Sequence, residues 1–104
     1  MSTFDERETA FENKFAHDEE MQFKAVARRN KLVGIWAADL LGKSGAEADA
    51  YALEVVKADF EEAGHDDVVR KLSADLTGRA DEAAIRAKMD ELLLIAKAQI
   101  LNEA

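Results

Sequence analysis

The pattern of hydrophobic positions changes character once, close to residue 20. Phe4, Phe11 and Phe15 are spaced so that one side of a helix would carry all three rings. The next positions of that stripe hold acidic or amide side chains, which cannot enter a core, and a new apolar stripe begins at Phe23. The interruption predicts a boundary between an N-terminal arm and a folded domain.

Four helical segments are predicted after this boundary, because apolar residues recur there at intervals of three and four. Gly42, Gly64 and Gly78 end the first three segments, as glycine does where the chain turns left-handed. In chain order the apolar faces comprise Phe23, Val26, Ala27, Val33, Trp36, Ala37, Leu40 and Leu41; Ala48, Tyr51, Ala52, Leu53, Val55, Val56, Phe60 and Ala63; Val69, Leu72 and Leu76; and Ile85, Met89, Leu92, Leu93, Ala96 and Ile100.

Short polar signals predict where three of the segments begin. Ser44 is followed three residues later by Glu47, the spacing of a capping box. Asp66 is the predicted N-cap of the third segment, and the fourth begins near Asp81. Gly34 lies inside the first segment, and close packing of another helix would account for it.

The connections between the segments are only a few residues long, which implies antiparallel neighbours. We therefore predict an all-α fold, an antiparallel four-helix bundle over residues 20–104 with a mobile, partly helical arm over residues 1–19. Composition favours this prediction, because proline is absent and the strong helix formers alanine, leucine and glutamate are abundant. No window shows the alternation that is typical of strands.

Charge and composition limit the classes of partner and the cellular compartment that we expect for the protein. The formal net charge of −8 disfavours nucleic acid and anionic lipid as partners of the whole surface. The absence of cysteine excludes disulfides and thiolate zinc sites. The acidic N-terminus does not resemble a signal peptide, and the apolar run at 92–96 is too short to cross a bilayer. We expect a cytoplasmic protein without direct membrane insertion.

The predicted arm has too much charge and too little apolar surface to fold alone. Seven acids and two bases occupy the first twenty residues, and an isolated helix of this length is marginal in water. We interpret the phenylalanines as anchors for an external surface. The alternative is that Phe4, Phe11 and Phe15 fold back onto the bundle.

A basic segment follows the arm directly. Residues 21–31 carry Lys24, Arg28, Arg29 and Lys31 and no acid. Neither an aromatic platform nor a nucleic-acid recognition motif accompanies these cations. We interpret them as a basic helix face that is available to acidic side chains of a partner protein.

Candidate chemistry is sparse. The stretch LGKSG at 41–45 ends like a phosphate-binding loop, but Ala37 stands where that loop needs its first glycine, and a helix precedes it in place of a strand. Lys43 and Ser44 remain candidates for a weak nucleotide contact at the following helix N-terminus.

Metal binding and catalysis have less support. Glu62 and His65 have the Glu-x-x-His spacing of di-iron bundles, but those sites need two such pairs, and Gly64 interrupts this one. No serine has a histidine at suggestive spacing. We expect no catalytic residues, no metal and no cofactor.

Several long stretches carry a resemblance that spans the chain: FDERE at 4–8, FENKFAHDEEMQFKA at 11–25, ARRNKLVGIWAADLLG at 27–42, YALEVVKADFEEAGHDDVVRK at 51–71 and IRAKMDELL at 85–93. Together they resemble the zeta subunit, an ATPase inhibitor, of alphaproteobacterial F-type ATP synthases. The glycines that join the helices occupy corresponding places.

The resemblance implies a non-catalytic regulator whose N-terminal arm enters an interface between alpha and beta subunits of the soluble ATPase head, near the gamma subunit of the rotor. The protein would then be peripheral to the membrane through the ATP synthase. The partner-binding residues expected on this basis are Phe4, Arg7, Phe11, Lys14, Phe15, Phe23, Lys24, Arg28 and Arg29. Two alternatives stay open, a small bundle that binds ATP or ADP and an assembly factor of the ATP synthase.

Overall fold

The structure, a computed structural model, describes residues 19–59 and 65–103. These residues form four helices, α2 (Glu19–Leu40), α3 (Ala46–Ala58), α4 (Asp66–Asp75) and α5 (Glu82–Glu103), and contain no strand. The predicted all-α class is confirmed. The division of the chain at residue 19 stays a prediction, because residues 1–18 lie outside the described part.

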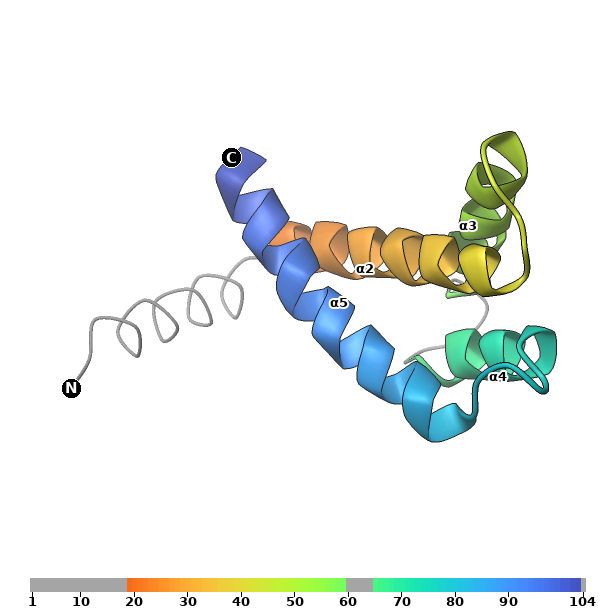
Figure 1. The fold of residues 1–104 in the computed structure, drawn as a ribbon. Helices are drawn as coiled ribbons and strands as arrows, with labels where there is room; N and C mark the ends of the chain where they lie inside the picture. Colours follow the sequence, from red (N-terminus) through yellow and green to blue (C-terminus); the bar gives the residue numbers. More distant parts are fainter. Residues whose placement is uncertain (1–18, 60–64, 104) are drawn as a thin grey trace.

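Helix α2 is the centre of the arrangement, with α3 and α5 packed against it (Figure 1). Helices α2 and α5 cross at an angle and run in opposite directions. Arg28, early in α2, contacts Glu103 at the end of α5, whereas Leu40, at the end of α2, accepts a hydrogen bond from Arg79 ahead of α5. Helices α3 and α4 also run in opposite directions, because Tyr51 of α3 contacts Asp75 at the end of α4, whereas Asp59 after α3 contacts His65 ahead of α4.

The main core lies where α2, α3, α4 and the first half of α5 meet. It is built from small and aliphatic side chains, whose largest fully buried members are Leu72, Leu76 and Ile85. Gly34 has the predicted role, because a Cβ atom at this position would lie 2.7 Å from the Cα atom of Ala52. The missing side chain therefore lets α3 approach the backbone of α2.

Glycine also ends α2 as predicted. Gly42 has a φ of 77°, the amide of Lys43 donates to the carbonyl of Ala38, and the amide of Gly42 donates to the carbonyl of Asp39. These two bonds define a Schellman motif, which only a residue that tolerates the left-handed region can close without strain.

Two of the predicted N-caps are wrong. Helix α3 has Gly45 as its N-cap and no side-chain capping bond, so Ser44 and Glu47 do not form a capping box. His65, and not Asp66, is the N-cap of α4. The start of α5 is confirmed, because a carboxylate oxygen of Asp81 accepts the amide hydrogen of Ala84 at 2.8 Å.

Three large side chains assigned to buried faces are exposed instead. Phe23, Leu40 and Leu53 are 60%, 37% and 52% exposed. The buried face of α2 is narrower than predicted, and Phe23 lies outside it. Its buried residues are mostly small, with Arg29 and Asn30 as the polar exceptions. The assigned positions Phe60, Ala63 and Gly64 lie outside the described residues.

Candidate docking surface

The described members of the predicted partner-binding set lie in the first three turns of α2, beside the end of α5. Phe4, Arg7, Phe11, Lys14 and Phe15 lie outside the described residues, so their role stays a prediction. The four others differ in their environment: two lie at the surface, one forms an ion pair between helices, and one is buried.

Phe23 and Lys24 lie at the surface. Phe23 is 60% exposed. Lys24 forms an ion pair with Glu20 one turn earlier, at 3.3 Å, and both side chains are mostly exposed. Such a pair contributes little to stability and is easily exchanged. The amine of Lys24 is therefore available to a carboxylate of another molecule.

Arg28 links α2 to the end of α5. Its guanidinium donates two hydrogen bonds to the Glu103 carboxylate and one to the side-chain oxygen of Gln99, each 2.9 Å long. The bond to Glu103 raises the pKa of Arg28, and the same bond lowers the pKa of Glu103. A bidentate pair of this kind fixes the geometry of both side chains.

Arg29 is not part of an exposed basic face, which corrects the prediction for this residue. It is 3% exposed, and its guanidinium donates to the side-chain oxygen of Asn30 and to Nδ1 of His65. Burial lowers the pKa of Arg29, and the carboxylates of Asp59 and Asp90 oppose that shift. Arg29 therefore connects α2 to the start of α4, and the proposed surface omits it.

The position of Arg29 in the helix gives the reason. Ala25, Val33 and Ala37 are buried and lie four residues before, four after and eight after Arg29, so all four share one side of α2. The prediction grouped all the cations of residues 21–31 on one exposed face and did not take this spacing of buried residues into account. His65 is the N-cap of α4 and contacts Arg29 through Nδ1.

A groove with a volume of about 620 Å³ runs between the first turns of α2 and the end of α5. Its lining comes from three helices: Met21, Phe23, Lys24, Ala27, Arg28 and Lys31 of α2, Val56 of α3, and Ile100 and Glu103 of α5. Three of the four charged side chains are cationic. The groove brings together Phe23, Lys24 and Arg28 of the predicted set.

Sequence reasoning missed the contribution of α5 to this groove. Ile100 packs with Ala25 in a small cluster that is separate from the main core, flanked by Met21, Leu93 and Leu101. The apolar spacing in the last segment contained Ile100, but no local signal indicates which part of α2 it would face.

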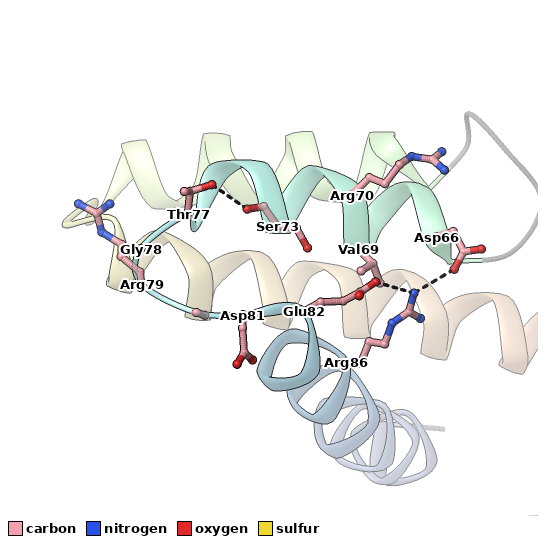
Figure 2. Close-up of a pocket in the computed structure, with 11 residues that line it drawn as sticks. Asp66, Val69, Arg70, Ser73, Thr77, Gly78, Arg79, Asp81, Glu82 and Arg86 are labelled. Atoms are coloured by element: carbon pink, nitrogen blue, oxygen red, sulfur yellow. Dashed lines mark hydrogen bonds and ion pairs between the residues drawn. The ribbon is translucent and has the colours of Figure 1, made fainter.

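A second hollow, with a volume of about 920 Å³, lies between α4 and the start of α5 (Figure 2). In it, Arg86 joins Asp66 to Glu82 by hydrogen bonds of 3.3 and 3.1 Å. The lining balances the cations Arg70, Arg79 and Arg86 against the anions Asp66, Asp81 and Glu82. It therefore favours neither sign of ligand charge.

The candidate nucleotide residues serve the end of α2. The amide of Lys43 completes the Schellman motif, and the backbone carbonyl of Ser44 accepts the amide hydrogen of Glu47. The positive charge of Lys43 also contributes to lowering the pKa of Asp75. A nucleotide contact at Lys43 and Ser44 stays a prediction.

Residues 19–59 and 65–103 contain no group of three or more side chains that could hold a metal ion. Glu62 lies outside the described residues, and His65 contacts Arg29 and Asp59. None of the helices described is long and apolar enough to cross a membrane.

Comparison with known proteins shows similarity to a protein family and to solved structures. The family model described as ATPase inhibitor subunit zeta matches residues 1–99. A structure solved by NMR in solution is 64% identical and superimposes with a TM-score of 0.75, covering 81% of this chain and 99% of that chain. No curated protein matches the sequence.

Proposed function

Because the chain belongs to the ATPase inhibitor subunit zeta family, we propose that it inhibits ATP hydrolysis by an F-type ATP synthase through its N-terminal arm. The arm enters an interface between alpha and beta subunits of the soluble head, near gamma, and blocks rotation in the hydrolytic direction. The protein is then a non-catalytic regulator, and it is cytoplasmic and peripheral to the membrane through the enzyme.

The observation that carries this proposal is the extent of the family match. It begins at residue 1 and therefore includes the arm together with the helical domain. Within the described residues, the main core contains side chains of α2, α3, α4 and α5.

The arm is proposed to fold as it binds. Helix α2 already begins at Glu19, so it can template further turns towards the N-terminus without a new nucleation step. At about 1.5 Å per residue a helical arm would reach roughly 30 Å from the bundle. Phe4, Phe11 and Phe15 are the anchors, and Arg7 and Lys14 pair with acidic groups of the head.

The energetics are favourable only if the rings are buried. Each phenylalanine contributes roughly 2 kcal/mol on burial, whereas the ordering of a disordered segment costs about 2–5 kcal/mol. Three rings therefore exceed the ordering cost by a small margin. Loss of all three is expected to remove most of the binding energy of the arm.

The test is a triple Phe→Ala variant at residues 4, 11 and 15, assayed for inhibition of ATP hydrolysis by the isolated head. The variant keeps every charge, and it is expected to lose most inhibition while the helical domain still melts cooperatively. Deletion of residues 2–18, which preserves α2, is expected to do the same. Undiminished inhibition by both variants would refute the arm as the effector.

The same assay addresses the assembly-factor alternative. Binding is measured beside hydrolysis, for example by copurification of the protein with the head. A wild-type protein that copurifies with the head at stoichiometric levels without reducing hydrolysis would favour an assembly role.

A further inference from the structure

The groove between α2 and α5 has the features of a site for a helix from another protein. Its apolar floor is formed by Met21, Ala27, Val56 and Ile100, with the ring of Phe23 at its edge. A floor built from three helices is a fixed shape, because each helix is held by the packing of the domain. Grooves of this kind commonly accept the apolar face of an amphipathic helix.

The charged rim indicates what kind of helix fits. Lys24 and Lys31 lie on the same side of α2, seven residues apart, which corresponds to about 10 Å along the helix. Lys31 is exposed and forms no ion pair with any other described residue. Among the residues that the structure describes, Lys24 pairs with Glu20, which is itself exposed. Both amines can therefore accept a new carboxylate partner.

The remaining two charged side chains of the rim have a different role. Arg28 and Glu103 bind each other in a bidentate pair between α2 and the end of α5. Their charges cancel, so the net charge of the groove comes from the lysines. The groove is therefore positive, although the net charge of the whole chain is −8.

Ala27 lies between the two lysines and has the smallest side chain of the groove. A partner helix with acids two turns apart would place an apolar side chain opposite Ala27, since positions i+3 and i+4 lie between i and i+7 on one face. The groove thus complements an acidic amphipathic helix in both charge and shape.

The position of the groove identifies the protein that supplies this helix. The lining begins at Met21, two residues after the start of α2, and the arm precedes α2 directly. Any protein that holds the arm is therefore beside the groove. Two linked contacts raise the local concentration of each other, so even a weak second site would increase affinity considerably.

We propose that this groove binds an acidic amphipathic helix on the surface of the ATPase head, next to the place where the arm enters. This inference rests on the proposed function and deepens it. The arm supplies the inhibitory block, and the groove supplies affinity and orientation.

The test compares full-length variants in the hydrolysis assay with the purified head, and measures both the half-inhibitory concentration and the maximal inhibition. Lys31→Glu is expected to raise the half-inhibitory concentration about five- to tenfold, because one attraction is replaced by a repulsion. Maximal inhibition at saturating protein is expected to be unchanged. Added salt is expected to weaken the wild type more than the variant, since it screens the charges.

Two further variants separate the groove from general effects of charge and folding. Arg70→Glu makes the same change of charge on α4, away from the groove, and is expected to inhibit like the wild type. Ala27→Met fills the floor without a change of charge and is expected to raise the half-inhibitory concentration as Lys31→Glu does. Thermal melting of each variant establishes that the domain remains folded.

The outcomes distinguish the two proposals. Equal half-inhibitory concentrations for the wild type, Lys31→Glu and Ala27→Met would overturn the groove and leave the arm intact. If Arg70→Glu weakened inhibition as much as Lys31→Glu, net charge would explain the effect, and the groove would again be refuted. If the triple Phe→Ala variant inhibited fully while Lys31→Glu still weakened inhibition, the arm would fail and the groove would stand.

Discussion

The two ends of α2 are packed in different ways. Towards its C-terminus, α2 is enclosed by α3, α4 and the first half of α5, around a core with Leu72, Leu76 and Ile85 fully buried. Towards its N-terminus, the described part of α2 packs against the end of α5 through a small cluster of Ala25 and Ile100. The first end contains the main core, and the second has a groove between the first turns of α2 and the end of α5.

The difference follows from the side chains at each end. Gly34 and Ala52 allow close approach of α2 and α3, which removes nearly all solvent from the residues around them. At the other end α2 presents long charged side chains, and its contact with α5 includes the ion pair of Arg28 and Glu103. An end that is held partly by polar contacts can offer apolar surface to a partner.

We call the C-terminal part of α2 with the main core around it the closed end, and the N-terminal part beside the end of α5 the open end. The largest expected effect on stability is at the closed end. Leu72→Ala removes a fully buried side chain and should destabilise the fold by about 2–5 kcal/mol. Ile100→Ala, at the open end, should cost less, because the residue is 7% exposed and belongs to a smaller cluster than Leu72 does. Denaturant unfolding of the two variants measures the contrast, and equal losses would mean that both ends contribute alike.

The contact between α2 and α3 gives the next largest effect. Gly34→Ala would place a Cβ atom 2.7 Å from the backbone of Ala52, so the two helices must separate. We expect a loss of about 1–3 kcal/mol, although alanine favours helix. The measurement is again denaturant unfolding. A variant more stable than the wild type would show that the close approach has no energetic importance.

A polar cluster at the closed end should give a smaller effect. The hydroxyl of Tyr51 donates to the carboxylate of Asp75 at 2.7 Å, and the amine of Lys71 donates to the same oxygen at 3.0 Å. Tyr51→Phe is expected to cost about 1 kcal/mol, the usual contribution of one hydrogen bond. Thermal unfolding at neutral pH measures this loss.

The same cluster should make the stability of the fold depend on pH, and the pKa shift of Asp75 sets the direction of that dependence. Partial burial alone would raise the pKa of Asp75, but the hydrogen bonds from Tyr51 and Lys71 outweigh it and lower the pKa below its ordinary value. The carboxylate therefore stabilises the fold above the ordinary pKa of aspartate, about 3.9, and this contribution is lost as the pH falls through the lower folded value. Asp75→Asn should make stability less dependent on pH in this acidic range. An unchanged acid limb of the stability profile would contradict this assignment.

The smallest effect is expected at the open end. Glu103→Gln removes the charge of an exposed ion pair with Arg28, and pairs of this kind seldom contribute measurably to stability. The melting temperature should stay within error of the wild type. A clear drop would mean that the end of α5 depends on this pair, and that the groove is less rigid than proposed.

The sequence predicted the helices well because their signals are local. Apolar spacing identified all four described segments, and Gly42 ends α2 as its position indicated. The errors concern which residue caps each helix. Ser44 had the spacing of a capping residue, but the chain follows a different path after the Schellman motif, and α3 begins without a side-chain cap.

The candidate surface was predicted less completely than the fold. Phe23, Lys24 and Arg28 do line one groove, whereas Arg29, indistinguishable from Arg28 by composition, points inward to Asn30 and His65. Which of two adjacent arginines is buried depends on the rotation of α2 about its axis. Packing against α3 and α5 decides that rotation, and no local signal specifies it.

The sequence by itself determined the helical elements of the described residues and their order along the chain. These features depend on residues close together in the chain, through periodicity, capping and charge. Only the tertiary structure decided which side of α2 is buried and which helix ends meet to form the groove. Those features depend on contacts between residues far apart in the chain, such as Arg28 with Glu103, and a single amino-acid sequence carries no local record of them.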